Sequence, residues 1–361
     1  MNLKASYIKK ELFFQKPAGT SRGVYTEKMC YFILISDKDN PNNFGIGEAS
    51  PLAGLSLDFG DDFETKIQKT CEELNEIELE IFDFNIPILL NQLISDKLPA
   101  IKFGVETAMW DFLNGHRRSI FVNDFSLGNT SLEINGLVWM NDYSTMLKEI
   151  HQKVKDGYQT IKIKVGAINF EDELRLLAEI RDAYGYNTEI RLDANGAFNE
   201  ENVFEKLERL SNFRIHSIEQ PIKPKQLDLF AEVIAKSPIH IALDEELIGV
   251  TEYLQKMNLL KKLKPAYIIL KPTLLGGFQH CREWIEIANR LNIKWWLTSA
   301  LESNIGLNAI AQFAANFNNP MPQGLGTGKL YQQNFDCPLQ LEDGRMTYNP
   351  EIPWNLSLIG K

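Results

Sequence analysis

Six charged residues in the middle of the chain recur at a nearly constant interval, and their types could support acid–base chemistry at a metal ion. In chain order they are Lys162, Lys164, Asp193, Glu219, Asp244 and Lys271. From the second lysine onward, successive members are 25 to 29 residues apart. One strand, one helix and two loops occupy about that length, which is the repeat unit of a (β/α)₈ barrel.

Each of these residues closes a short apolar run, at 161–164, 190–193, 218–219, 241–244 and 268–271. Such runs predict buried parallel strands. Helical apolar patterns follow Asn169, Asn199 and Lys225 between the runs. Barrel enzymes carry their chemistry at the carboxyl ends of the strands, and the charged residues fall at those ends.

The three acids should be neighbours on the barrel rim, where their charges repel unless a cation lies between them. Oxygen ligands of this kind favour Mg²⁺, with Mn²⁺ as the alternative. The competing interpretation, which holds for any one acid taken alone, is a helix N-cap or a loop charge. Asp244 is preferred over its neighbour Glu245 because it continues the strand, and Glu245 is expected to support the ligands from behind.

The lysines at 162 and 164 should point the same way, because alternate residues of a strand share a face. If both point inward, like-charge repulsion lowers the pKa of one of them toward the neutral form that a general base needs. The alternative is a pair of solvated lysines. Lys271, across the barrel, would be a second acid or base or a fixed positive charge. Arg191 is expected to pair with a barrel carboxylate and hold the ligands in place, and Asn195 to support the rim.

Composition limits the choice of partner and compartment. The 361 residues carry a formal net charge of −10, which argues against nucleic acid, and contain no apolar run of the ~20 residues that span a bilayer. The four cysteines form no CxxC pair, a pattern typical of reduced cytoplasmic proteins. We therefore expect a cytoplasmic protein with a small-molecule carboxylate substrate and no membrane partner. The oligomeric state is not predicted.

The order of patterns predicts three parts. Residues 1–125 should form an α+β capping domain, with strands at 6–14, 25–36 and 44–49 separated by breakers at 17–19 and 39–41, and helices within 61–115. Residues 126–329 should form the barrel, and residues 330–361 should return to the capping domain. The predicted fold class is thus α/β, a modified (β/α)₈ (TIM-like) barrel with an N-terminal α+β cap.

Five motifs in barrel order resemble the enolase superfamily, in its muconate-lactonizing-enzyme subgroup. They are Lys-Ile-Lys at 162–164, Leu-Asp-Ala-Asn-Gly at 192–196, Ile-Glu-Gln-Pro at 218–221, Ala-Leu-Asp-Glu at 242–245 and Leu-Lys-Pro at 270–272. The resemblance covers the whole chain. It implies that the three acids hold Mg²⁺, which binds a substrate carboxylate, and that Lys164 removes the α-proton to give an enediolate. It also implies that Lys162 lowers the pKa of Lys164, with Lys271 on the opposite face.

Within the subgroup, five further stretches resemble the o-succinylbenzoate synthases of menaquinone biosynthesis. They lie at 19–23, 47–51, 135–139, 298–303 and 323–328. This resemblance implies a carbon–oxygen lyase (hydro-lyase) that performs a syn dehydration. Lys164 would first take the proton and then protonate the leaving hydroxyl, and Lys271 would be a cationic stabiliser. It further implies that Arg22, Ser50 and Ser299 meet the substrate.

Other activities use the same lysines and metal. N-acylamino acid racemases and muconate cycloisomerases stay open as alternatives. Dipeptide epimerases carry an Asp-x-Asp motif on the eighth strand. They are disfavoured because the corresponding stretch of this chain, 324–328, has no acid. A non-catalytic binding module is disfavoured because every catalytic position is filled.

Overall fold

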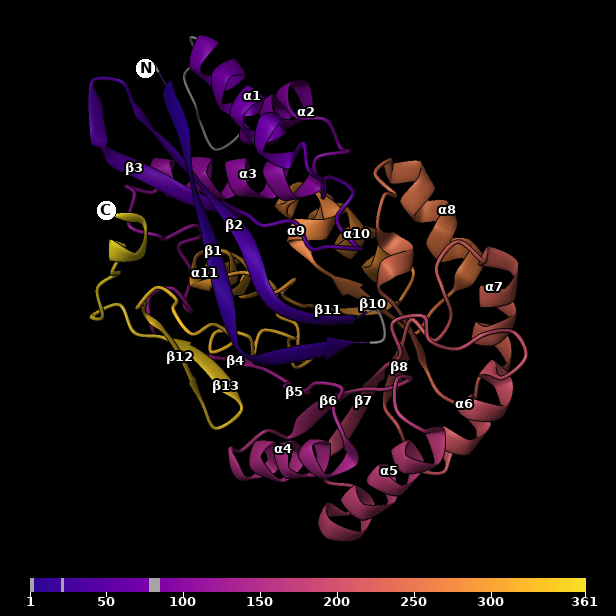
Figure 1. Cartoon of the computed structure of the whole chain (residues 1–361). Helices are drawn as coiled ribbons and strands as arrows, with labels where there is room; N and C mark the ends of the chain where they lie inside the picture. The colour runs from indigo at the N-terminus through magenta and orange to yellow at the C-terminus, as the bar shows by residue number, and fades with distance from the viewer. Residues whose placement is uncertain (1–2, 21–22, 78–84) are drawn as a thin grey trace.

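Seven parallel strands curl into one sheet and follow each other in chain order (Figure 1). The computed structural model describes residues 3–20, 23–77 and 85–361. The strands are β5 (Gly136–Val138), β6 (Thr160–Lys164), β7 (Glu189–Asp193), β8 (Ser217–Glu219), β9 (Ile241–Leu243), β10 (Tyr267–Leu270) and β11 (Lys294–Leu297).

A short segment at Gln323 and Gly324 closes this sheet into a cylinder. Gly324 bridges in parallel to Thr298 beyond β11, and Gln323 bridges to Ile134 before β5. The backbone N–H of Gly324 donates to the carbonyl of Leu297 at 2.7 Å. The predicted (β/α)₈-type barrel is therefore confirmed, with its eighth strand reduced to two bridging residues.

Helices cover the outside of the barrel (Figure 1). The α5 helix shows why they form: the Asn169 side chain caps it by accepting from the backbone N–H of Glu171 at 2.9 Å, and Leu177 and Ile180 are buried in the barrel core. The barrel helices are α4 (Tyr143–Lys155), α5 (Phe170–Tyr184), α6 (Val203–Ser211), α7 (Leu227–Lys236), α8 (Tyr253–Leu263), α9 (Pro272–Leu275), α10 (Phe278–Arg290) and α11 (Asn304–Ala314). A 3₁₀ turn, η2 (Glu245–Leu247), follows β9.

In the described residues of the N-terminal part, a three-stranded antiparallel sheet combines with three helices, which the strand and helix patterns predict. Its elements are β1 (Leu3–Thr20), β2 (Gly23–Asp37), β3 (Asn40–Ala49), α1 (Phe63–Glu76), α2 (Ile86–Leu93) and α3 (Pro99–Leu113). The expected strand break at 17–19 is wrong. β1 continues through a register shift between Phe13 and Ala18, and Thr20 pairs with Gly23. A bulge accommodates Pro17, which has no N–H to donate to the ladder.

The C-terminal segment contacts both other parts. Its hairpin of β12 (Leu339–Glu342) and β13 (Arg345–Tyr348) pairs with β4 (Leu132–Glu133), and η3 (Ser357–Ile359) lies near the chain end. The backbone N–H of Gln332 donates to the carbonyl of Phe13 at 2.8 Å, and the rings of Phe32 and Phe335 lie 5.0 Å apart. The boundaries expected at 125 and 329 stay predictions. Among the described helices, none has the length and apolar character needed to cross a membrane.

Two glycines let β3 lie directly on α3. A Cβ atom at Gly47 would come within 1.9 Å of the carbonyl oxygen of Gly104, and one at Gly45 would come within 2.1 Å of that of Ala108. Both obstacles are backbone atoms of a helix, which cannot move aside as a flexible side chain can. This contact sets the distance between strand β3 and helix α3.

We expect Gly47→Ala to lower the free energy of unfolding by ~1–3 kcal/mol, because the added methyl group forces the sheet away from α3. Urea unfolding followed by circular dichroism measures the loss. Gly60→Ala is the matched control, since a Cβ there meets only the Asp62 carboxylate, at 3.1 Å. Equal stability of the two variants would contradict the close packing of β3 on α3.

Candidate active site

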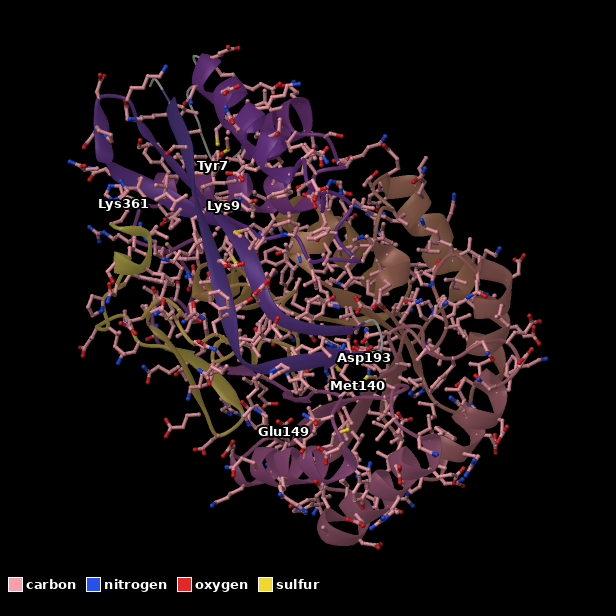
Figure 2. The ribbon with its side chains drawn as sticks, in the orientation of Figure 1. Tyr7, Lys9, Met140, Glu149, Asp193 and Lys361 are labelled. Carbon is pink, nitrogen blue, oxygen red and sulfur yellow. The ribbon has the colours of Figure 1, made fainter. Side chains whose placement is uncertain are left out.

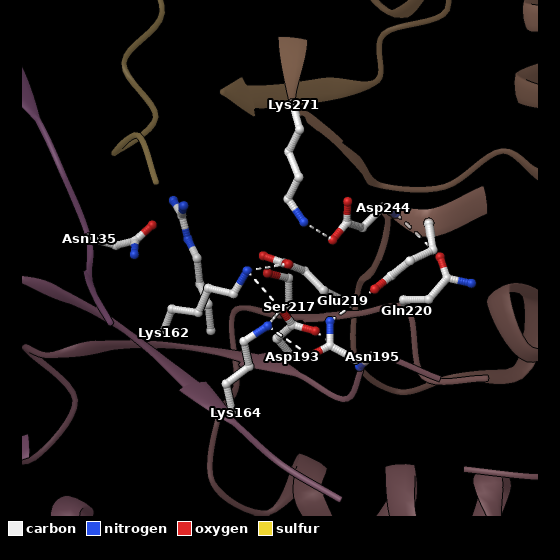
Figure 3. Close-up of polar contacts among 12 residues, drawn as sticks. Asn135, Lys162, Lys164, Asp193, Asn195, Ser217, Glu219, Gln220, Asp244 and Lys271 are labelled. Atoms are coloured by element: carbon white, nitrogen blue, oxygen red, sulfur yellow. Dashed lines mark hydrogen bonds and ion pairs between the residues drawn. The ribbon is translucent and has the colours of Figure 1, made fainter. Parts of the chain in front are cut away.

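The barrel strands bring all six charged residues to one end of the cylinder (Figure 3). On β6 and β7, Lys164 pairs in register with Asp193, and on β7 and β8 Asp193 pairs with Glu219. Asp244 and Lys271 directly follow β9 and β10. All six side chains are buried, with Lys271 the most exposed of them at 8%.

The three acids form a compact oxygen cluster. One carboxylate oxygen from each of Asp193, Glu219 and Asp244 lies within 4.8 Å of the others. Among the described residues, no hydrogen-bond donor reaches the buried Oε1 of Glu219. Clustered carboxylates with a free buried oxygen suit a hard divalent cation, because such ions prefer oxygen ligands. The residues present therefore fit a metal site.

Three lysine side chains pair with this cluster. Lys162 Nζ lies 2.8 Å from Asp193 Oδ2 and 2.5 Å from Glu219 Oε2. Lys164 Nζ lies 2.7 Å from the same oxygen of Asp193, and Lys271 pairs with Asp244 from the other side of the cluster. Two amines therefore face each other across the three carboxylates (Figure 3).

The surroundings give the three lysines different proton affinities. Burial lowers the pKa of Lys164, and the positive charges of Lys162 and Lys271 lower it further, against the pull of Asp193. Burial also disfavours the charged form of Lys162, but the three surrounding carboxylates outweigh it and raise its pKa. The pKa of Lys271 is raised in the same way, chiefly by Asp244 against burial. Lys164 is thus the amine best suited to lose its proton.

The residues expected to support the rim do so unequally. Asn195 accepts from Lys164 Nζ at 2.7 Å, its backbone N–H donates to Asp193 at 3.0 Å, and its amide donates to Glu245 at 3.0 Å. Arg191 points into the barrel but pairs with Glu189, at the start of its own strand, at 3.2 Å. Its guanidinium stacks on Trp296, 4.0 Å from the ring centre. Asn195 therefore orients the rim directly, whereas Arg191 fills the layer below it.

A pocket of about 620 Å³, its open mouth included, lies against the three lysines. The described residues that line it include no carboxylate. They are Thr20, Tyr25, Leu52, Leu55, Asn135, Leu137, Trp139, Lys162, Lys164, Lys271, Thr298, Ser299, Ala300, Leu301, Gly324, Gly326 and Thr327. In Figure 2, Asp193 lies near the hairpin end of β1 and β2, the end that carries Thr20 and Tyr25 to the pocket.

The three residues expected to contact substrate have different positions. Ser299 lines the pocket, where its hydroxyl lies 2.7 Å from that of Thr327. The Ser50 hydroxyl donates to Glu48 at 2.7 Å, and Ser50 is not among the lining residues. Arg22 lies outside the described residues. The substrate contacts assigned to these three residues stay predictions.

Several lining residues were not assigned from the sequence. Asn135 and Thr298 each carry a buried side-chain oxygen that accepts no hydrogen bond from the described protein, so both can meet a ligand. Strand alternation could have found Asn135, Leu137 and Trp139, which share one face. Nothing in the sequence marks Tyr25, because its approach to the pocket depends on how the N-terminal sheet lies over the barrel.

Comparisons with known proteins agree with this geometry. A model of the Enolase C-terminal domain-like family matches residues 145–352. The o-succinylbenzoate synthase of Desulfotalea psychrophila is 40% identical over an alignment of 372 positions, which covers 95% of this chain and 98% of that protein. The crystal structure of MenC from Desulfotalea psychrophila superposes with a TM-score of 0.86 at 37% identity, covering 96% of this chain and all of that one.

More distant structures share the fold. The dipeptide epimerase of Enterococcus faecalis, in complex with Mg and the dipeptide L-Leu-L-Tyr, superposes with a TM-score of 0.84 at 20% identity over 98% of both chains. At that identity the likeness concerns the fold alone. The family match and the relative that is 40% identical show the family as well as the fold. This chain belongs to the enolase superfamily and, within it, to the family of the o-succinylbenzoate synthases.

Proposed function

We propose that this protein catalyses the syn dehydration of 2-succinyl-6-hydroxy-2,4-cyclohexadiene-1-carboxylate to o-succinylbenzoate, a step of menaquinone biosynthesis. The observation that supports this proposal most is the composition of the pocket. Three buried lysines lie at one end, apolar side chains line the walls beyond them, and the described lining residues include no carboxylate. Such a pocket suits a carbon ring that bears anionic groups. The relative that is 40% identical is named for the same activity.

Lys164 is the residue that would move the proton. Its lowered pKa makes it the lysine of the three that most readily forms the neutral amine. That amine accepts the proton α to the substrate carboxylate, and the resulting ammonium then protonates the hydroxyl that leaves from the same face. A divalent cation held by the three acids, which we propose to be Mg²⁺ or alternatively Mn²⁺, supplies positive charge for the carboxylate when bound. Lys162 and Lys271, whose pKa values are raised, stay charged and favour the anionic form of the substrate.

Epimerisation of dipeptides is less well supported. A dipeptide carries an α-ammonium group, which needs a carboxylate partner. The closing segment of the barrel contributes Gly324, Gly326 and Thr327 to the pocket. None of these offers a carboxylate to the ammonium group, and the nearby lysines repel it. The proposal for an aromatising dehydration therefore stands ahead of the epimerase alternative.

The cellular compartment of the protein is part of the same proposal. All four cysteines are buried free thiols, as expected for a protein of the reducing cytoplasm. We therefore propose that the reaction takes place in the cytoplasm.

We expect Lys164→Ala to lower kcat by at least ~10³-fold, because the variant loses the group that both accepts and returns the proton. The formation of o-succinylbenzoate, followed by ultraviolet absorbance in the presence of Mg²⁺, measures the effect. Lys155→Ala, at an exposed position on α4, is the control and should keep wild-type activity. Undiminished turnover by a folded Lys164→Ala protein would remove this lysine from its assigned role.

We expect metal binding to release a proton near neutral pH. Burial raises the pKa of Glu219 to about 8 in the metal-free protein, with Asp193 and Asp244 adding to the effect against Lys162. Below that pH the carboxyl group is protonated and must ionise to bind a cation. The apparent Mg²⁺ affinity should therefore rise with pH up to about 8 and then level off.

Titration calorimetry at pH 7 in two buffers of different ionisation enthalpy counts the released protons. Glu219→Gln should bind Mg²⁺ more weakly and release fewer protons than the wild type. Wild-type binding that is independent of pH and of the buffer would contradict this account of the carboxylate cluster.

A further inference from the structure

Lys28, on β2 of the N-terminal sheet, is buried outside the catalytic cluster. Its side chain is 5% exposed, and its ammonium donates to the backbone carbonyls of Ala300 at 2.6 Å and Leu301 at 3.1 Å. Within the described residues, it forms no ion pair with a carboxylate. The buried carboxylate of Glu302 lies close enough to compensate part of its charge, but the hydrogen bonds of the ammonium go to the two carbonyls. The lysine therefore fixes the position of this backbone.

The segment that Lys28 holds is a wall of the pocket. Ser299, Ala300 and Leu301 follow β11 and line the pocket beside the catalytic lysines. Leu301 adopts a left-handed backbone conformation, with φ of 63°, which is strained for a residue with a branched side chain. Such a conformation persists only where its surroundings hold it in place.

The side chains of Tyr331 and Glu302 hold the same backbone at 300–301, and Thr273 in turn holds Glu302. The hydroxyl of Tyr331, from the C-terminal segment, donates to the carbonyl of Leu301 at 2.5 Å. The buried carboxylate of Glu302 accepts from the backbone N–H of Ala300 at 2.7 Å and also from the hydroxyl of Thr273. Thr273 lies two residues beyond Lys271, so the network links the wall to the strand end that carries a catalytic lysine.

We propose that Lys28 is a positioning residue that clamps the pocket wall at 299–301 in the shape that binds substrate. The clamp joins two segments that line the pocket, because β2 also contributes Tyr25 to the lining. Lys28 has no contact with the reacting groups. It acts through Ala300 and Leu301, and its removal weakens substrate binding while leaving proton transfer by Lys164 intact.

Lys28→Met keeps the length of the side chain and removes its donors, and Lys28→Arg restores donors. Lys102→Met is the matched control, because Lys102 is also buried in the N-terminal part but pairs with Asp96 and Asn91 on α2 and the following loop, away from the pocket. We expect Lys28→Met to raise KM by about tenfold and to change kcat by less than about threefold. Lys28→Arg should restore most of the wild-type KM, and Lys102→Met should leave KM unchanged.

Hydrogen–deuterium exchange tests the clamp without any measurement of turnover. This is needed because the KM and kcat measurements rest on the proposed dehydration. Backbone amides at 299–306 should exchange faster in Lys28→Met and stay at the wild-type rate in Lys102→Met. Unchanged exchange in Lys28→Met, or the same acceleration in both variants, overturns the proposal. If the wild-type protein does not turn over the cyclohexadiene carboxylate, the proposed function fails, and the exchange experiment alone decides the clamp.

Discussion

The site depends on the charge balance between three acidic side chains and three lysines inside the mouth of the barrel. Neither set could be buried without the other, because an unpaired charge in the interior costs several kcal/mol. The register of β6, β7 and β8 places the lysines and acids side by side, so the fold and the charge balance support each other. The same balance separates the roles of the lysines. For Lys164, burial together with the charges of Lys162 and Lys271 outweighs the pull of Asp193 and lowers the pKa.

The barrel and the N-terminal part contribute different things to the pocket. The barrel strands supply every proposed catalytic group, and the hairpin of β1 and β2 supplies Thr20 and Tyr25 over the top. Enolase-superfamily members share the first of these contributions while differing in the reactions they catalyse, so the substrate is chosen by the walls. The proposed Lys28 clamp concerns these walls, whereas the lysines concern the chemistry.

The positions of the six charged residues were predicted from the sequence because each lies at or near the end of a strand whose apolar run and spacing are visible in the sequence itself. The same signal says less where tertiary contacts decide. β1 continues past Pro17 with a register shift, the eighth strand shrinks to Gln323 and Gly324, and the carboxylate that pairs with Arg191 is that of Glu189, below the rim. Lys28 was missed because its partners are backbone carbonyls 272 residues away or more, which no local pattern reveals.

A crystal structure of the protein with Mg²⁺ tests the central claim most directly. The account predicts one ion bound by an oxygen from each of Asp193, Glu219 and Asp244, at about 2.1 Å, with Lys164 and Lys271 on opposite sides of the pocket. An ion bound elsewhere, or either amine turned out into solvent, would contradict it.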